Sequence, residues 1–410
     1  MSIRLLSLAT LLTLVGCSSP DLSSEFDAET HDAGITDATI DLASGPDAAP
    51  YDARLPDVEP VDAYGDAARE FVSSDISVAG QVNINSGDNG WIGDVLLTSD
   101  IEGIVIGRLN AGALPYDENS IYFVLTGADI FVSDPSDGDG IPTGYCASYC
   151  GWHSSVWTKV SGTNQLIHYG MIGDPENPDC NYGGGENACS GFNYSDDGGA
   201  LPPTPNGDWA ADSMITVLCH ETAESATDPN PSMVDDTKLS WITIPDEGEF
   251  DEICDKCVWS WGNVYAEDGA WYNVAFGGHK YLIQQNWVLQ GNDRCALDLT
   301  GNPGFDETTA GPTVSLVSNL NDLQPIDYFG GHVDAAPIHV YIVWYGWPDP
   351  NPSADVITTM FNALGDSEWW SIARQYFQIS PDAGIIFDSG EKSSDTDGAT
   401  DASTLDVHLD

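Results

Sequence analysis

The amino-acid sequence predicts an α/β fold, a single layered domain with a mixed sheet flanked by helices. Two short runs of β-branched and aromatic residues, IYFVLT at 121–126 and IHVYIVW at 338–344, are typical of buried strands. Apolar residues recur with helical spacing at 209–227, and an Asp-Pro pair follows as a stop signal. Residues 352–364 and 367–377 predict two further helices. Strands that alternate with helices favour α/β layering.

A hairpin and a weak strand complete the ordered part of the chain. Residues 271–276 and 280–287 read as two strands joined by a two-glycine turn. Residues 300–331 are rich in Gly, Pro, Asn, Asp and Thr, which is typical of a linker, with one weak strand at 313–317. We therefore expect the ordered chain to consist of residues 71–299 and 332–387, joined by this linker.

The N-terminus predicts export and a lipid anchor. In residues 1–16 one Arg precedes an apolar run of about ten residues, which is typical of a signal peptide and too short to span a bilayer. The sequence LVGC at 14–17 resembles a bacterial lipobox, which implies a lipidated Cys17 at the mature N-terminus. Because Ser18 follows the Cys, resemblance to Gram-negative lipoproteins implies the outer membrane or cell surface. An ordinary signal peptide with a chance Cys is the alternative.

Both ends of the mature chain are expected to be disordered. Residues 17–70 are dominated by Asp, Ala, Pro and Ser, a like-charged composition that predicts an extended tether behind the lipidated Cys. Order should begin near Glu70. Residues 388–410 are again polar and acidic and are predicted to form a disordered tail.

The charge of the chain excludes several partners. Lys and Arg total 11 against 65 Asp and Glu, a formal net charge of −54. Such a field repels phosphate backbones and anionic lipid headgroups, so we expect no nucleic-acid partner and no membrane contact beyond the lipid anchor. An unknown protein or cell-wall substrate remains as the expected partner. The same acidity is typical of surface proteins and of proteins that gather cations.

The motif His220-Glu221-x-x-Glu224 carries the candidate chemistry. Residues four apart on a helix project from one face, so His220 and Glu224 can supply two ligands to a divalent metal. This is the logic of HExxH zinc helices, with Glu in place of the second His. Glu221 would then act as the general base. The alternative is an ordinary helix surface that carries two acids and a His.

Three residues elsewhere are candidates for a third ligand. Glu252 and Asp255 lie in a downstream acidic cluster, and His153 lies in the segment CGWH. Any one of them would complete a three-ligand Zn²⁺ site with an open position for water, and the sequence does not choose among them. Ca²⁺ is a second possible cation, because residues 83–90 and 134–140 form acidic, Gly-rich loops. Neither loop has EF-hand spacing, which favours simple turns.

Besides Cys17, the chain has an even number of cysteines: 146, 150, 180, 189, 219, 254, 257 and 295. In an exported protein this number predicts up to four disulfides. The pair Cys254-x-x-Cys257 could instead hold zinc, but the chain has no second CxxC, and the compartment favours oxidation.

Several segments together resemble the phosphate-induced protein 1 family, also called the EXORDIUM family, known from plants, fungi and bacteria. The matching segments include GYCASYCGWHSS (144–155), PNGDWAADSMITVLCHETAESATDP (205–229), DEICDKCVWSWG (251–262), WYNVAFGGHKYLIQQNWV (271–288) and VYIVWYGWPDPNPSADVITTMFNALGDSEWWSIARQYF (340–377). The resemblance covers residues 78–299 and 332–377. It implies an extracellular protein, which in plants is associated with growth signalling.

The order of these segments departs from the family. The VWYG strand and the WWSIARQYF helix come first in the family, whereas here they come last. A circular permutation explains this order, with residues 300–331 joining the old ends and new ends between Phe377 and Val78. The alternative is a truncated second copy that starts a new domain.

The resemblance also guides the disulfide pairing. Cys219 and Cys254 are additions to the cysteines usual in the family, so we expect them to pair with each other. The other expected pairs are Cys180–Cys189, Cys257–Cys295 and Cys146–Cys150.

Three functions follow from these observations. The leading one is a metallopeptidase-like zinc hydrolase at the cell surface, with His220 and Glu224 as ligands and Glu221 as base. The second is a non-catalytic protein of extracellular or cell-wall interactions, and the third is a Ca²⁺-stabilised adhesion module.

Overall fold

The computed structural model describes residues 69–133, 144–146, 149–177, 180, 189–190, 203–231, 239–243, 251–289, 294–300, 314–316 and 326–379. The expected signal peptide, the lipidated Cys17, almost all of the tether, the acidic tail and the loop 134–140 lie outside these residues. Within the described residues, no helix is long and apolar enough to cross a membrane.

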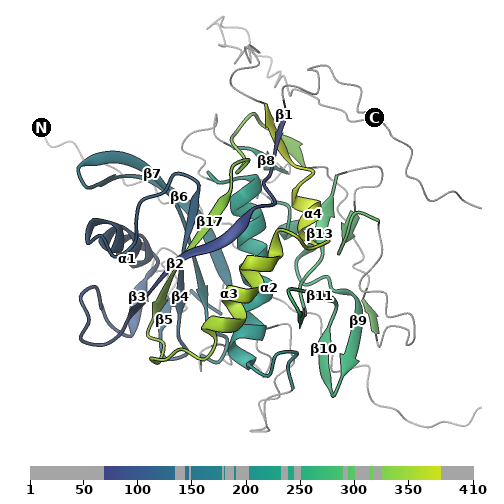
Figure 1. Ribbon diagram of the computed structural model, residues 1–410, viewed down its shortest axis with the longest axis horizontal. Coiled ribbons are helices and arrows are strands. Elements are labelled where there is room, and N and C mark those ends of the chain that lie inside the picture. Colours follow the sequence, from purple (N-terminus) through teal and green to yellow (C-terminus); the bar gives the residue numbers. More distant parts are fainter. Residues whose placement is uncertain are drawn as a thin grey trace, which may run out of the picture.

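A five-stranded mixed sheet forms the centre of the molecule (Figure 1). Its strands, in spatial order, are β2 (Ile76–Ile84), β17 (Ile338–Tyr345), β4 (Ser120–Thr126), β7 (Thr163–Gly173) and β6 (Gly151–Val160). The first four run parallel, and β6 is antiparallel to β7. The predicted α/β class with a mixed sheet is therefore confirmed.

Strand β17, from the C-terminal part of the chain, lies inside this sheet. It pairs in parallel with β2 on one side and with β4 on the other, where Val343 is opposite Val124. The two apolar runs recognised in the sequence are thus neighbouring strands. This pairing is what a permuted domain requires, and circular permutation itself stays a prediction.

Helices cover both faces of the sheet (Figure 1). Helix α1 (Thr98–Asn110) packs on one face against β4, β6 and β7. On the other face α2 (Trp209–Thr227) packs on β6 and β7, and α3 (Ala354–Leu364) packs on β2 and on α2. Every residue of β4 is buried as a result, which explains why its sequence is a continuous apolar run rather than an alternating one.

Helix α2 has the predicted bounds but a different environment. Asp208 caps its first turn by accepting a hydrogen bond from the Ala211 backbone N–H, and the helix ends before Asp228 and Pro229. All residues of the helix are buried. The sheet covers one side, and α3, α4 (Trp370–Ala373) and the segment 251–289 cover the rest. Its polar C-terminal half therefore lies in the interior of the protein.

The predicted helix 367–377 is mostly wrong. Only α4 is α-helical, and Phe377–Ile379 form strand β18. Tertiary hydrogen bonds compete with helix geometry here, because the Trp369 indole N–H donates to the Gln284 carbonyl and the Trp370 indole N–H donates to that of Ser73.

Further short strands pair with one another outside the central sheet. They are β1 (Arg69–Phe71) with β18, β3 (Val95–Leu97) with β5 (Phe131–Ser133), β8 (Trp241–Ile242) with β16 (Asp327–Tyr328), β9 (Gly262–Glu267) with β10 (Ala270–Tyr272) and β15 (Val314–Leu316), β11 (Val274–Phe276) with β12 (His279–Tyr281), and β13 (Asn286–Val288) with β14 (Arg294–Ala296). Strand β15 is the weak strand that the linker predicted.

The two-glycine hairpin is confirmed, with shorter strands. Gly277 and Gly278 connect β11 to β12 with φ angles of 60° and 81°. Positive φ at both turn positions is the geometry that Gly adopts without steric cost. Residues 270–272 pair with β9 instead of extending the hairpin.

Three disulfides link six of the eight described cysteines: Cys146–Cys180, Cys150–Cys189 and Cys257–Cys295. Only the last pair was predicted correctly. Cys219 and Cys254 are free and buried, so the predicted bond between them is wrong. The two thiols face different neighbours: Cys219 Sγ contacts Met360 Sδ at 3.7 Å, and Cys254 Sγ contacts Asn286 Oδ1 at 3.5 Å.

The calcium prediction is only partly covered by the described residues. Residues 85–91 form a turn in which the Asn85 backbone N–H donates to Asp88 Oδ2 and the Asp88 N–H donates to the Asn85 carbonyl. Those bonds agree with the simpler reading of residues 83–90 as a turn with a solvated acid.

Candidate metal centre

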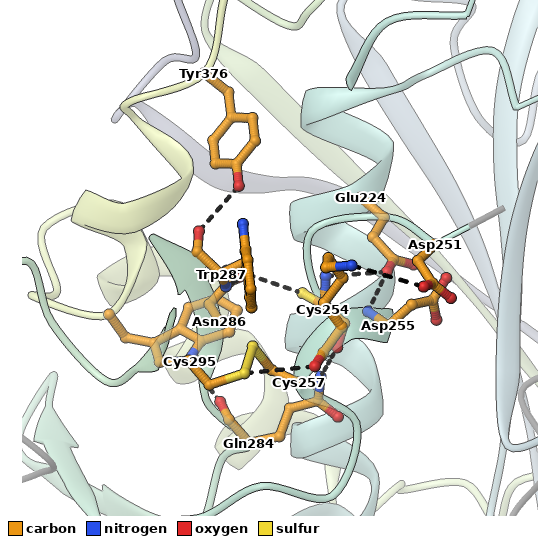
Figure 2. Close-up of a disulfide and its surroundings, with 12 residues drawn as sticks. Glu224, Asp251, Cys254, Asp255, Cys257, Gln284, Asn286, Trp287, Cys295 and Tyr376 are labelled. Atoms are coloured by element: carbon orange, nitrogen blue, oxygen red, sulfur yellow. Dashed lines mark hydrogen bonds and ion pairs between the residues drawn. A yellow bond between two sulfur atoms is a disulfide. The ribbon is translucent and has the colours of Figure 1, made fainter. Parts of the chain in front are cut away.

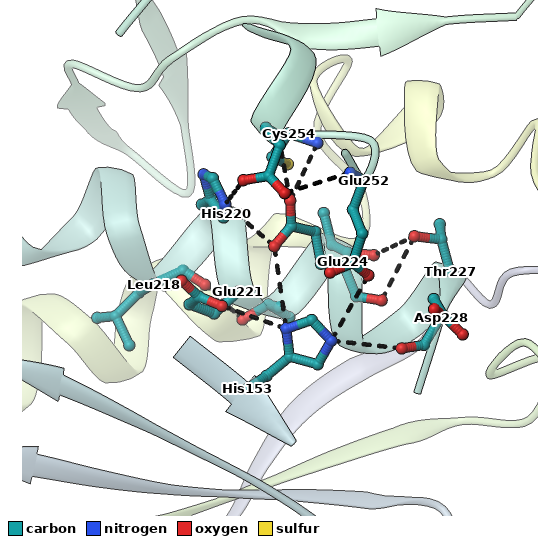
Figure 3. A network of polar contacts seen from close by, with 12 residues as sticks. His153, Leu218, His220, Glu221, Glu224, Thr227, Asp228, Glu252 and Cys254 are labelled. Atoms are coloured by element: carbon teal, nitrogen blue, oxygen red, sulfur yellow. Dashed lines mark hydrogen bonds and ion pairs between the residues drawn. The ribbon is translucent and has the colours of Figure 1, made fainter. Parts of the chain in front are cut away.

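Helix α2 supplies the first side chains of the candidate site. His220 and Glu224 lie one turn apart, and their Nε2 and Oε2 atoms are 3.0 Å from each other (Figure 3). Both side chains are buried, with 9% and 3% of their surface exposed. The alternative of an ordinary solvent-facing helix surface therefore does not describe this segment.

Strand β6 brings His153 to the same helix. Gly151 precedes it on the same face of the strand, and a Cβ atom there would lie 2.6 Å from Val217 Cγ1. The absence of a side chain at Gly151 thus lets α2 approach the sheet. His153 Nδ1 then lies 3.2 Å from Glu221 Oε2 and 3.9 Å from Glu224 Oε2.

The segment before and within the short 3₁₀ helix η4 (Asp255–Cys257) closes the site. Glu224 Oε1 accepts hydrogen bonds from the backbone N–H groups of Cys254 and Asp255, at 3.3 and 3.2 Å. Asp255 Oδ1 is 3.3 Å from His220 Nε2. The Glu252 N–H donates to Asp255 Oδ2 at 3.2 Å, which holds the two acidic residues together.

A disulfide and two buried polar contacts fix this segment in place (Figure 2). Cys257 is bonded to Cys295 on β14. Gln284 Nε2 donates to the Cys254 carbonyl at 3.0 Å, and the Trp287 N–H donates to the Ile253 carbonyl at 3.1 Å. The carboxylates are therefore carried by a braced loop, which favours a preorganised site.

All three candidates for the third ligand are thus brought to the His220–Glu224 pair. Ligand-type atoms of three residue sets lie within 4.8 Å of one another: His220, Glu224 and Cys254; His153, Glu221 and Glu224; and Glu224, Glu252 and Asp255. Glu224 is common to all three sets, so it is the centre of the cluster.

The spacing around His220 resembles that of zinc ligands. Bonds of about 2.0–2.1 Å at tetrahedral angles put neighbouring ligand atoms about 3.3–3.4 Å apart. His220 Nε2 lies 3.0 Å from Glu224 Oε2 and 3.3 Å from Asp255 Oδ1. Among the three candidates, Asp255 is therefore the one best placed to act with His220 and Glu224.

The cluster carries more negative charge than its own residues neutralise. It contains five buried carboxylic side chains and two imidazoles: Glu221, Glu224, Asp228, Glu252 and Asp255, with His153 and His220. Lys256 is paired with Asp251 at 3.9 Å and lies over the Trp287 ring. No Lys or Arg is paired with the five acids within the described residues. Unpaired buried charge is costly, so either protons or cations must compensate it.

With no cation bound, raised pKa values favour the protonated forms of these side chains, and the bound protons offset the buried negative charge. Burial lowers the pKa of His220, but the carboxylates of Glu224 and Asp255 outweigh burial and raise it well above its usual value. Burial, followed by the charge of Asp255, raises the pKa of Glu224 to about 7. Burial and then Glu224 raise the pKa of Glu252 well above its usual value.

Comparison with known proteins identifies the family. Residues 58–297, more than half of the chain, match the family described as the phosphate-induced protein 1 conserved region. The chain belongs to the phosphate-induced protein 1 family. The matched region contains every candidate site residue from His153 to Asp255, whereas β17 and α3 lie beyond it.

Two plant proteins are similar to part of this chain. Protein EXORDIUM-like 5 of Arabidopsis thaliana is 25% identical over 237 residues, which cover 55% of this chain and 59% of the relative. Protein EXORDIUM-like 3 of the same plant is 26% identical over 215 residues, covering 48% of this chain and 55% of the relative. The chain thus spans less than two thirds of the length of both relatives. No solved structure matches it significantly.

Family membership and the three disulfides are consistent with a protein that is secreted or lies at the cell surface.

Sequence reasoning missed two participants of the site. Cys254 lies in one ligand-type set with His220 and Glu224 but was assigned to a disulfide. Asp228 was read only as a helix stop, yet its backbone carbonyl lies 3.3 Å from His153 Nε2. Asp228 follows Glu224 by four residues, a spacing that would have placed this acid one turn further along the same face.

Proposed function

We propose that this member of the family is a metallopeptidase-like, zinc-dependent hydrolase. The observation that carries the proposal is that His220 Nε2 lies 3.0 Å from Glu224 Oε2 and 3.3 Å from Asp255 Oδ1, two spacings near those of tetrahedral zinc ligands. The excess of buried carboxylates around them supports a resident cation. A bound Zn²⁺ would supply Lewis-acid chemistry and lower the pKa of water to about 7.

The residues around the zinc ligands have separate roles in this proposal. Glu221 lies within 4.8 Å of His153 and Glu224 in one ligand-type set. In this proposal its carboxylate would accept a proton from an attacking water and pass it to the leaving group. His153 holds Glu221 by a contact of 3.2 Å and positions it. The backbone N–H groups that bind Glu224 Oε1 orient its other oxygen toward His220.

The test measures zinc and hydrolysis on the same purified protein. We expect the wild type to bind zinc and to cleave peptide substrates in an activity that chelation removes and zinc restores. Glu221→Gln should keep the zinc and lose at least about 100-fold in rate, because general-base catalysis typically contributes that much. His220→Ala should lose the zinc ion that His220 ligates and, with it, the hydrolysis. Glu267→Gln, an exposed acid paired with Lys280, is the matched control. Unchanged hydrolysis in both site variants would contradict the proposal.

We further propose that the chain is anchored at the outer membrane through Cys17. The lipobox-like sequence LVGC supports this location, and the three disulfides support an oxidising compartment. In a Gram-negative host, Cys17→Ser should release the protein from the membrane fraction without changing its zinc content. Retention of the variant in membranes would contradict the anchor.

A second candidate function is non-catalytic interaction in the extracellular space or cell wall. The observation in its favour is burial, because no side chain among His153, His220, Glu221, Glu224, Glu252 and Asp255 is more than 9% exposed. A closed metal site stabilises a fold without chemistry. Zinc binding without hydrolysis of any peptide would select this function over the first.

A further inference from the structure

We propose that the cluster holds a second divalent cation, bound by His153 Nε2, Glu252 Oε1 and the backbone carbonyl oxygen of Asp228. The inference rests on the proposed function for the first ion, at His220, and deepens it by making the centre dinuclear. The second site uses atoms that the first site does not engage.

The ring orientation of His153 defines the first ligand. Its Nδ1 lies 3.2 Å from Glu221 Oε2, and an ionised carboxylate only accepts hydrogen bonds, so Nδ1 is the donor. A neutral ring protonated at Nδ1 presents a lone pair at Nε2. Metal-ligating histidines commonly have this arrangement, with the second ring nitrogen bonded to a carboxylate.

The surroundings of His153 Nε2 consist of further acceptors (Figure 3). The Asp228 carbonyl oxygen is 3.3 Å away, and Glu252 Oε1 is 3.7 Å away. Glu252 Oε1 has no hydrogen-bond partner within the described residues, and the residue is only 2% exposed. Asp228 Oδ2 also lacks a partner, in a residue that is fully buried. With a lone pair on Nε2, these electron-pair donors meet without a hydrogen between them, and a cation would satisfy them. The competing state is an imidazolium whose Nε2–H donates to the Asp228 carbonyl.

The first ion cannot serve both histidines. The His153 atom nearest to Glu224 is Nδ1, at 3.9 Å from Oε2, and its hydrogen points to Glu221. The lone pair at Nε2 lies on the far side of the ring, toward Glu252 and Asp228. Each imidazole therefore faces its own set of oxygen atoms, with Glu224 between them.

Charge supports two ions. With both imidazoles neutral, the five carboxylates carry five negative charges, one divalent ion leaves three, and a second leaves one. One imidazole nitrogen with carboxylate and carbonyl oxygens is a donor set suited to zinc or manganese. We take zinc as the probe because it is the ion expected in the first site.

The experiment counts zinc ions per chain. The purified full-length chain is stripped with chelator, loaded with Zn²⁺, dialysed and measured by mass spectrometry of the metal. We expect two zinc ions in the wild type and in the control Glu267→Gln, and one in Glu252→Gln, which keeps the size of the side chain but removes its charge. His220→Ala should also retain one ion, the one at His153.

A second measurement needs no variant. Crystals of the zinc-loaded wild type should show two anomalous peaks at the zinc absorption edge, one within bonding distance of His153 Nε2 and one of His220 Nε2. A single peak, or one zinc per wild-type chain, overturns the second site. One zinc ion per chain together with hydrolysis would support the proposed function and contradict the second site. Two zinc ions per chain without hydrolysis would support the second site and contradict the hydrolase function.

Discussion

Two interior regions of this protein are both buried but differ in their chemistry. In strands β4 and β17 of the central sheet, Phe123, Val124 and Val343 are fully inaccessible and need no polar partners. Beside the sheet, the C-terminal half of α2 contributes to a buried polar cluster of five carboxylates and two imidazoles. The sheet is stabilised by burial itself, whereas the cluster is buried because the sheet and the braced 251–257 loop hold it there.

The sheet and the cluster are stabilised by different interactions. Apolar packing is independent of pH and metal ions, so the sheet should set the baseline free energy of unfolding. The cluster has a free energy that depends on what compensates its charge. A change in the sheet should therefore alter the free energy of unfolding equally at any zinc concentration, whereas a change in the cluster should alter its dependence on zinc and pH.

The largest effect is expected in the sheet. Phe123 is fully buried and stacks on Phe361 of α3, with 6.1 Å between the ring centroids. Phe123→Ala should lower the free energy of unfolding by about 3–5 kcal/mol, through lost burial and the cavity left behind. Urea denaturation measures it. The loss should be the same with zinc or with chelator, and a loss that depends on zinc would show that the two regions are coupled.

Metal removal should have the next largest effect and act through the cluster alone. A ligand present at 100 times its dissociation constant stabilises the folded state by about 2.7 kcal/mol. We expect chelation to lower the free energy of unfolding of the wild type by about this amount. Thermal unfolding with and without excess Zn²⁺ measures it. The same chelation should leave His220→Ala with a smaller loss, and an equal loss in that variant would contradict the site.

The two regions should also differ in their response to pH. Burial raises the pKa of Glu224 and of Asp228 to about 7, from ordinary values of 4.5 and 3.8. Between about pH 4.5 and 7 the folded, metal-free protein therefore binds more protons than the unfolded chain, so its stability should fall as pH rises through 7. The raised pKa of His220, which loses its proton as pH rises, acts in the same direction.

Zinc should reverse this trend, because its ligands must lose their protons before they bind. The measurement is urea unfolding at pH 5, 6, 7 and 8, with chelator and with zinc. The difference in unfolding free energy between the two conditions should widen as pH rises. A difference that stays constant or narrows would mean that the ion does not bind these acids.

The smallest effect is expected at the contact between the two regions. Gly151 allows α2 to lie against β6, and a Cβ atom there would meet Val217 Cγ1 at 2.6 Å and the Met171 carbonyl at 3.1 Å. Gly151→Ala should destabilise the protein by about 1–3 kcal/mol through overpacking. It should also weaken zinc binding, because His153 moves with the strand. Gly103→Ala, at an open position of α1 where an added Cβ has no neighbour within 4 Å, is a control for glycine replacement that should leave zinc affinity unchanged.

Local patterns predicted much of the fold. The continuous apolar runs of β4 and β17, the bounds of α2 and the two-glycine turn all depend on residues close together in sequence. Prediction failed where distant groups intervene, as at residues 367–377. There the indole N–H groups of Trp369 and Trp370 bond to remote carbonyls, and the backbone leaves the helix early.

The candidate site shows the same division. Helical periodicity alone placed His220 and Glu224 on one face, and the acidic segment around Glu252 and Asp255 was recognised from its composition. The disulfides were mostly mispaired, because pairing depends on which thiols the fold brings together, and Cys219 faces Met360 instead of Cys254. The position of His153 beside Glu221 could not be read from spacing, since 68 residues separate them.

The sequence by itself determined the α/β class, the helix that carries the HExxE motif and the acidic excess that calls for a cation. These are properties of periodicity and charge, which act over a few residues or over the whole chain. Only the tertiary structure decided that β17 lies between β2 and β4, that α2 is buried on all sides, and that His153, Glu252 and Asp228 meet at one point. Those choices depend on packing between segments far apart in sequence, where the free energy is set by shape and by the cost of leaving buried polar atoms without partners.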